Sequence, residues 1–342
     1  MKILYIGQYE KGATSRMRGE KLSALIPNCS MQIIDTTIPY KTCGRMARSM
    51  GVRFKVGPLI KKTNEYIQAN LPNSHCDLIW VDKAVFLTPI TTKRLRGLTD
   101  RLLHFTPDMA FFDNRSAHFE KCIDMYNFLV TTKTAEISEY KKRVTKAKLI
   151  LATQGFDRNI HKSIVPFSKK ESAVVFVGLC EPNREQLVQL LIDQGIKINL
   201  AGRGWGAFLK RNSGNKFLDF SGEDVIAGDY ALLLSGSLLG LGLLSKKFPE
   251  LHTTRTFEIP ACGTALITES NQEINSFFNQ DEAIFFDSPE ELVSKIKYYL
   301  LRRDKLQRLT QKGEVRVHQD GRDYESILRK IIQEIGLDGY AK

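Results

Sequence analysis

Short apolar runs separated by helical segments recur along the whole chain, and this rhythm constrains the fold more than any other feature. In the first half, β-prone apolar runs fall at 2–6, 31–35, 77–82, 102–105, 127–131 and 148–151. The rhythm restarts with a strand-like run at 173–178, after a polar connector at 167–171. Short apolar strands alternating with helices are typical of a parallel sheet covered on both faces. The sequence therefore predicts an α/β fold with two Rossmann-like, doubly wound parallel-sheet domains.

We place the domain boundary in the connector, with an N-terminal domain at 1–168 and a C-terminal domain at 169–342. Further strands are expected at 196–200, 265–268 and 283–286, and further helices at 184–194, 230–235, 288–299 and 324–335. The last helix is a candidate to pack back on the N-terminal domain. In doubly wound folds, ligands bind beyond the carboxyl ends of the strands, so the site is expected in the cleft between the domains.

The composition is that of a globular protein with two ordinary domains: 342 residues, 42% hydrophobic and 26% charged. No apolar run reaches the ~18–20 residues that span a bilayer. The first residues lack the apolar stretch and cleavage site of a signal peptide, so a cytoplasmic protein is expected. The six cysteines are scattered without a C-x-x-C pair. This argues against a zinc ribbon or a disulfide framework and favours buried free thiols.

The net charge of +12 is confined to one half of the chain. Residues 1–165 hold 27 Lys and Arg against 14 Asp and Glu, a net +13, whereas residues 166–342 are close to neutral at −1. A basic half indicates a surface that meets an anionic partner, such as nucleic acid, anionic lipid or a charged substrate. A solvated lysine-rich surface is the alternative. The densest basic run, with Met50 and Phe54 interleaved, comprises Arg45, Arg48, Arg53, Lys55, Lys61 and Lys62.

Two glycine-containing turns follow strands of the second half. In the first, Gly178 ends a strand and Arg184 stands at the start of the next helix. Free N–H groups and the helix dipole attract phosphate there, and an arginine can clamp phosphate oxygens. In the second, Gly202, Arg203, Gly204, Trp205 and Gly206 let the backbone approach a ligand closely. Their spacing is not a dinucleotide fingerprint, and a structural turn is the alternative.

A carboxylate interrupts an apolar run at Glu258, which follows Phe257 and precedes Ile259. A lone buried carboxylate costs free energy unless the protein or a ligand supplies its partner. Thr253 or Thr254 could cap a short helix here. Arg255 near its start would favour a diphosphate, and Glu258, one turn later, could accept hydrogen bonds from sugar hydroxyls.

Together these segments resemble the two-domain, GT-B-fold glycosyltransferases of the group 1 type, and most of all the branch that includes spore-maturation glycosyltransferase-like proteins. Residues 253–263 are similar to the signature of that branch, and residues 284–292 are similar to the segment after it. Glu250 and Glu258 have the E-x7-E spacing of retaining members. The run at 14–18, which includes Arg16 as a candidate binding residue, also resembles this branch.

The resemblance implies roles for several residues. Glu258 matches the carboxylate that binds the ribose of the nucleotide, and Arg184 falls where many members have a phosphate-binding lysine. The arginine that members carry after the first glycine is absent, since Leu179 stands there; Arg255 or Arg203 could supply that charge.

Backbone segments and the first glutamate of the pattern are implied as well. Residues 202–205 and the turn containing Gly222 occupy the region where the backbone meets the base. Glu250 matches the first glutamate of the E-x7-E pattern, although its polar surroundings also fit a surface role.

The resemblance further implies transfer of a sugar from a UDP- or GDP-sugar to a hydroxyl of a glycan, lipid-linked or cell-surface acceptor. No metal or other cofactor is expected, because arginines and helix dipoles would stabilise the leaving diphosphate. If the enzyme retains configuration, the donor phosphate can take the acceptor proton. If it inverts, a base is needed, for which Asp108 is the first candidate and His118 the second.

The basic half would then meet an anionic or membrane-associated acceptor, with peripheral contact at the inner membrane face and a role in cell-surface polysaccharide biosynthesis. Three alternatives stay open: a GT-B sugar-nucleotide epimerase, a relative that has lost its activity, and a non-catalytic basic protein that binds nucleic acid. The last lacks a helix-turn-helix, a zinc finger and stacking aromatics, so no specific nucleic acid is expected.

Overall fold

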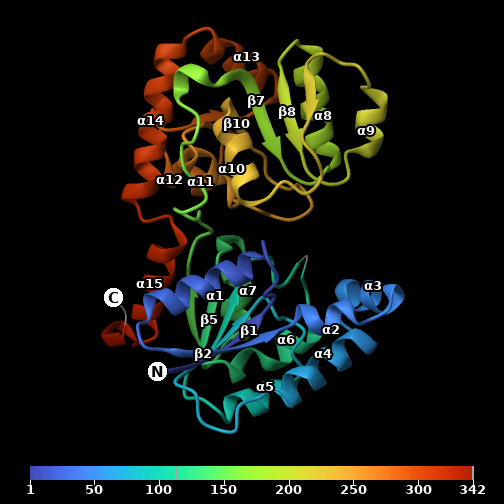
Figure 1. The fold of residues 1–342 in the computed structure, drawn as a ribbon, viewed down its shortest axis with the longest axis vertical. Helices are drawn as coiled ribbons and strands as arrows, with labels where there is room; N and C mark the ends of the chain where they lie inside the picture. Colours follow the sequence, from blue (N-terminus) through green and yellow to red (C-terminus); the bar gives the residue numbers. More distant parts are fainter. Residues whose placement is uncertain (113, 341–342) are drawn as a thin grey trace. The chain divides into compact units, whose positions relative to one another are not determined.

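The computed structural model describes residues 1–112 and 114–340. The chain forms two compact units, each built on its own sheet (Figure 1). The first unit comprises Met1–Thr153 and the C-terminal stretch from Tyr324; the second comprises Gln154–Asp323. The boundary expected at 168–169 thus lies inside the second unit, and the last helix belongs to the first.

The first unit contains a six-stranded, all-parallel sheet in the order β2-β1-β3-β4-β5-β6. Its strands are β1 (Lys2–Gly7), β2 (Ser30–Asp35), β3 (Leu78–Asp82), β4 (Leu102–Thr106), β5 (Phe128–Thr131) and β6 (Lys148–Leu151). Its helices are α1 (Thr14–Leu25), α2 (Thr37–Lys41), α3 (Arg45–Phe54), α4 (Pro58–Ala69), α5 (Pro89–Arg96), α6 (Ala117–Cys122), α7 (Ile137–Arg143) and α15 (Tyr324–Glu334).

Successive side chains of the buried strands enter two different cores, as the period of two in a strand requires. One core joins alternate residues of β1 to helices on one face: Leu4, Ile6, Ile67, Leu95 and Phe119. The other joins the intervening residues to α1 and α15: Ile3, Tyr5, Leu22, Ile327 and Ile331. Helices therefore cover both faces of the sheet, which is the doubly wound arrangement that the sequence predicts.

The second unit repeats the plan with a parallel sheet in the order β12-β11-β10-β7-β8-β9. Its strands are β7 (Glu171–Val177), β8 (Ile198–Ala201), β9 (Leu218–Phe220), β10 (Ser237–Gly242), β11 (Ala265–Glu269) and β12 (Ile284–Phe286). Its helices are α8 (Pro182–Asp193), α9 (Gly206–Arg211), α10 (Ala227–Ser235), α11 (Arg255–Ala261), α12 (Gln272–Phe277), α13 (Pro289–Leu300) and α14 (Arg303–Gln319).

In both sheets the order in which successive strands are added reverses at the first strand. From β1 the chain runs outward to β2 and then returns to β3 on the other side; from β7 it runs out to β8 and β9 and returns to β10. At such a switch point, the loops at the carboxyl ends of neighbouring strands diverge and leave a crevice. Each unit thus offers one place where a ligand is expected.

Local sequence explains where several helices begin. Thr88 caps α5 by accepting a hydrogen bond from the Thr91 amide, and Ser288 does the same for α13 through Glu291. In both helices a proline follows the cap, where its missing N–H group costs nothing.

Among the helices of the described residues, none is both long enough and apolar enough to cross a bilayer.

Candidate active site

The turn after β7 brings Arg184 to the switch point of the second sheet. Arg184 lies in the first turn of α8 and is almost fully buried. Its Nη1 is 3.0 Å from Oε1 of Glu181 and donates to the carbonyl of Leu179, and its Nη2 donates to the carbonyl of Leu243. Its buried Nε has no hydrogen-bond partner in the described residues. The Nε therefore carries a hydrogen-bond donor that the described residues leave unused.

A second guanidinium, that of Arg255 at the start of α11, lies near the first. Burial lowers the pKa of Arg184, and the positive charge of Arg255 lowers it further. The Nε of Arg255 is also buried without a hydrogen-bond partner within the part of the chain that the structure describes. Two like charges with unsatisfied donors are costly unless an anion joins them.

Carboxylates balance these charges and fix the loop after β10. Glu181 accepts a 2.9 Å hydrogen bond from Oγ of Ser245. Glu250 accepts from the Ser245 amide, and Glu269 accepts from the Leu244 amide. The charges of Glu181, Glu250 and Glu269 all raise the pKa of Arg184, although by less than burial and Arg255 lower it. The predicted Glu250 thus lies close enough to act on Arg184, together with two glutamates that sequence analysis did not single out.

The protein itself supplies a partner for Glu258, which lies on α11 and is 9% exposed. Tyr230 of α10 donates a 2.7 Å hydrogen bond to its Oε2, and Nε2 of His161 lies 3.7 Å from its Oε1. Nδ1 of His161 accepts from the Asp157 amide, so its Nε2 is the nitrogen that faces the carboxylate. Each carboxylate oxygen has more than one lone pair, so Glu258 has acceptor capacity for further donors.

The predicted glycine turns are close-packed backbone. Gly202 has φ +124°, and its amide donates to the carbonyl of Gly222. A Cβ added at Gly202 would lie 2.1 Å from the carbonyl oxygen of Gly178, so only glycine fits. Trp205 is fully buried, and its indole donates to that same carbonyl at 2.9 Å. The Trp205 side chain is therefore part of the core and is not available to stack on a base.

Three other predicted residues make contacts of their own. Arg203 forms an exposed 2.7 Å ion pair with Asp224. Thr254 directly precedes Arg255 and α11, but its side chain caps no amide of that helix. Arg16 belongs to the first unit, where it forms an exposed pair with Glu20 on α1. Of the two arginines considered for the missing charge, Arg255 is the one whose charge acts on Arg184.

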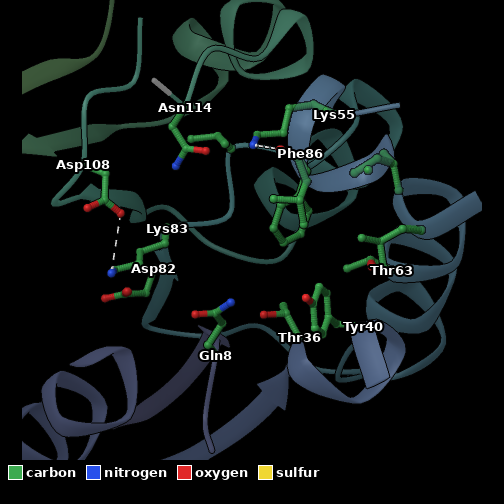
Figure 2. A pocket seen from close by; sticks show the side chains of 15 residues that line it. Gln8, Thr36, Tyr40, Lys55, Thr63, Asp82, Lys83, Phe86, Asp108 and Asn114 are labelled. Atoms are coloured by element: carbon green, nitrogen blue, oxygen red, sulfur yellow. Dashed lines mark hydrogen bonds and ion pairs between the residues drawn. The ribbon is translucent and has the colours of Figure 1, made fainter. Parts of the chain in front are cut away.

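The first unit has its own cavity, of about 230 Å³, at the switch point of its sheet (Figure 2). Residues that follow the carboxyl ends of four strands line it, among them Gln8, Thr36, Lys83 and Asp108. Asp108 lies 3.5 Å from the Lys83 ammonium, and Figure 2 shows the two groups facing each other. His118 lies on α6, outside the residues that line this cavity. Asp108 is thus placed at a cavity, and His118 is not.

A buried ion pair lies at the edge of this cavity. Arg18 donates to both oxygens of Asp82, at 2.8 and 2.7 Å. Tyr5 donates to Oδ2 of the same carboxylate at 2.9 Å. Burial alone would lower the pKa of Arg18 and raise that of Asp82, but the paired charges outweigh burial and shift both the other way. Sequence analysis missed this pair because its members are 64 positions apart.

No group of three or more His, Cys, Asp and Glu side chains in residues 1–112 and 114–340 is arranged to hold a metal ion. Metal independence stays a prediction.

Comparison with known proteins agrees with this geometry. Residues 184–333 match the family described as glycosyl transferase-like. Sucrose-phosphate synthase from Thermosynechococcus elongatus superposes with a TM-score of 0.70 at 15% identity, covering 98% of both chains. HepE from Anabaena, solved with UDP and glucose, has a TM-score of 0.69 at 15% identity, covering 98% of this chain and 99% of HepE. OtsA has a TM-score of 0.68 at 10% identity, with 98% and 99% covered. Among curated protein sequences, none matches the chain significantly.

These likenesses define the class of the protein. Its architecture is the GT-B fold. Residues 184–333, somewhat less than half of the chain, match the glycosyl transferase-like family, and this match indicates a transferase of the glycosyltransferase class. The likeness is to the group 1 type, as the sequence indicates. The similarity to the spore-maturation branch stays a prediction.

Proposed function

We propose that the chain moves a sugar from a nucleotide-sugar donor, a UDP- or GDP-sugar, to a hydroxyl of an anionic or lipid-linked glycan, with retention of configuration and without a metal. The observation that carries this proposal is the pair formed by Arg184 and Arg255. Each has a buried Nε without a hydrogen-bond partner in the described residues. Arg184 comes after β7 and Arg255 after β10, the two strands that flank the switch point of the second sheet.

A diphosphate fits this pair chemically. Its oxygens accept charge-assisted hydrogen bonds from guanidinium groups, and the start of α8 adds free amides and a positive dipole end. As the glycosidic bond breaks, negative charge grows on the leaving diphosphate. Fixed cations would then stabilise the transition state more than the bound donor, which is the condition for catalysis.

Glu258 would bind the ribose of the same nucleotide. The hydrogen bond from Tyr230 orients its carboxylate and leaves acceptor capacity for vicinal hydroxyls. UDP is the first nucleotide to test, because HepE was solved with UDP and with UDP-glucose. In a retaining reaction the departing phosphate can take the proton of the acceptor hydroxyl, so Asp108 would position the acceptor and would not act as the base.

The direct experiment is a thermal-shift screen of the whole chain with UDP-, GDP-, TDP- and CMP-sugars, followed by an assay for released nucleoside diphosphate with EDTA present. Stabilisation follows mass action, so a donor of modest affinity registers at millimolar concentration. We expect one nucleotide class to stabilise the protein and Arg184→Gln with Arg255→Gln to remove the effect. If no nucleotide stabilises the wild type, the proposed nucleotide-sugar donor is wrong. If EDTA abolishes turnover, the proposed metal independence is wrong.

The outcome also separates transfer from isomerisation. With donor alone we expect only slow hydrolysis, whereas a rearranged sugar nucleotide would identify an epimerase. The anomeric configuration of the transferred sugar, read by NMR, tests retention.

A further inference from the structure

Helix α3 (Arg45–Phe54) is amphipathic, and its apolar face lies on the surface. Met46, Met50 and Phe54 are spaced by four residues and therefore share one face of the helix. Their exposed fractions are 88%, 38% and 62%. We call these three side chains the apolar stripe. A helix of ten residues that leaves such a stripe exposed lacks a partner for it within the described chain.

The helix is attached to the rest of its unit through a small contact. Gly51 is its only buried residue, and a Cβ added there would lie 2.7 Å from the Leu59 side chain of α4. This close approach fixes α3 against α4. Within the stripe, the end of the Met50 side chain also reaches Gly57 just before α4, whereas Met46 and Phe54 remain largely exposed. In Figure 1, α3 lies at the rim of the first unit, beyond α2 and α4.

The sequence around the stripe is basic. Between Asp35 and Glu65 the sequence has no acidic residue and seven basic ones: Lys41, Arg45, Arg48, Arg53, Lys55, Lys61 and Lys62. Arg45 and Arg53 are exposed on α3 itself, and Lys61 and Lys62 are exposed on α4. Lys41 and Lys61 have acidic partners nearby, Glu10 and Glu65. The side chains of Arg45, Arg53 and Lys62 are exposed, and no ion pair joins them to a carboxylate in the described residues.

We propose that α3 is a membrane-docking helix, which lies in the interface of an anionic bilayer with its apolar stripe among the upper acyl chains and its basic residues on lipid phosphates. An exposed apolar face flanked by Lys or Arg is typical of helices that bind in the plane of a membrane. Each basic residue near an anionic surface strengthens binding, and the apolar stripe adds a contribution that salt does not screen. Nucleic acid would use the charges but not the stripe.

The cavity of the first unit lies beside this helix. Gly51, Val52 and Lys55 line it, together with Leu59 and Ile60 of α4. A bilayer under α3 would hold lipid headgroups near the cavity mouth, which fits the lipid-linked acceptor of the proposed function. Membrane docking itself does not depend on that function, because it is measured without donor or acceptor.

The experiment is sedimentation of the whole chain with vesicles of phosphatidylcholine alone or with 30% phosphatidylglycerol, at low and at physiological salt. We expect binding to the anionic vesicles at both salt concentrations. Replacing the stripe by Met46→Gln, Met50→Gln and Phe54→Gln should weaken it at least tenfold, and Arg45→Ser with Arg53→Ser should weaken it comparably. The matched controls are Ile90→Gln, an exposed apolar residue of α5, and Lys93→Ser with Arg94→Ser, exposed basic residues of that helix.

A fluorescent reporter on α3 tests directly whether the apolar stripe enters the bilayer, in addition to how much protein sediments. Both native tryptophans, Trp80 and Trp205, are fully buried, so Phe54→Trp would add the only exposed indole. Its emission should shift to the blue on anionic vesicles. The proposal is overturned if the wild type does not sediment with anionic vesicles, if the stripe variant binds like the wild type, or if the stripe is instead buried in a dimer that the stripe variant abolishes in light scattering.

Discussion

The hydroxyl of Tyr230 donates a 2.7 Å hydrogen bond to Glu258, so a residue of α10 holds the one carboxylate of the apolar helix α11. Burial raises the pKa of Tyr230 well above its usual value, and the charge of Glu258 raises it further. The phenol therefore remains a donor at any physiological pH. Glu258 is thus oriented by a neutral hydrogen-bond donor.

Replacing that charge tests the ribose site. Glu258→Gln should weaken UDP binding by about 1–3 kcal/mol, the range for hydrogen bonds to a charged group. Tyr230→Phe should cost about 0.5–1.5 kcal/mol, because the carboxylate stays but loses its orientation. Calorimetric titration with UDP measures both. Glu290→Gln, an exposed glutamate of the same unit, is the control. An unchanged affinity for Glu258→Gln would remove this residue from the site.

The paired arginines predict a kinetic asymmetry. Arg184→Gln and Arg255→Gln should each lower kcat by about 10²–10³, the scale for losing one donor that stabilises developing charge. UDP affinity should fall less, because the charge on the diphosphate is smaller before the bond breaks. Arg203→Gln, which breaks only the exposed pair with Asp224, should behave like the wild type. Equal losses in kcat and in affinity would indicate binding without transition-state stabilisation.

The role of Asp108 follows from the stereochemistry. In a retaining reaction Asp108→Asn should raise the KM for acceptor and leave kcat within about tenfold, since the side chain lines the cavity but moves no proton. A general base would instead contribute about 10²–10⁴. Steady-state kinetics with varied acceptor separates the two, with His118→Gln as a control outside the cavity. A loss of kcat beyond a hundredfold would assign Asp108 as the base.

The buried pair formed by Arg18 and Asp82 predicts a large effect on stability. Asp82→Asn leaves the Arg18 charge buried without its counter-charge, which costs about 3–5 kcal/mol. Urea unfolding followed by Trp80, whose indole lies 3.4 Å from Asp82, reports on this unit in a Trp205→Phe background. Arg16→Gln, which removes an exposed pair on the same helix, should change stability by at most about 1 kcal/mol. Similar losses for both variants would contradict the assignment.

Lys170 predicts a pH dependence in the second unit. Burial lowers its pKa to about 8, although Cys262 and Glu314 act in the opposite direction. Between pH 8 and the pKa of an unfolded lysine, about 10.4, the unfolded chain binds more protons than the folded one. Stability should therefore rise with pH across this window, by about 3 kcal/mol at most.

The comparison with Lys170→Met isolates this contribution, because other groups titrate in both proteins. The free energy of unfolding of the wild type, relative to the variant, should increase from pH 8 to pH 10. A constant difference would mean that Lys170 stays protonated in the fold, held by the carbonyl of Ser235 and the hydroxyl of Thr264.

The strands were predictable because burial on both faces requires continuous apolar runs, and all six of the first half correspond to strands of the structure. Helices α2, α3 and α4 were missed, as was α14 (Arg303–Gln319). In α14 the buried residues include Thr310 and Gly313, so its inward face is not uniformly apolar and carries little periodic signal. Helix α3 buries only a glycine, so it carries no apolar core face that a periodic pattern could reveal.

The site was predictable only in part, for a related reason. Arg184 and Arg255 each lie in the first turn of a helix that comes after a strand. Because the carboxyl ends of parallel strands lie at one edge of a sheet, the two arginines come together there. Tyr230 and His161 lie on other elements, with no spacing that connects them to Glu258. Contacts between distant positions leave no periodic trace in one sequence.

The position of α15 has a consequence for how the protein is made. Its Ile327 and Ile331 complete the core that contains Tyr5, although some three hundred positions separate them. During synthesis the second unit can acquire its full set of strands and helices first, while one face of the earlier unit waits, uncovered, for the last segment to leave the ribosome. A chain truncated after residue 323 would therefore have a finished later half and an unfinished beginning.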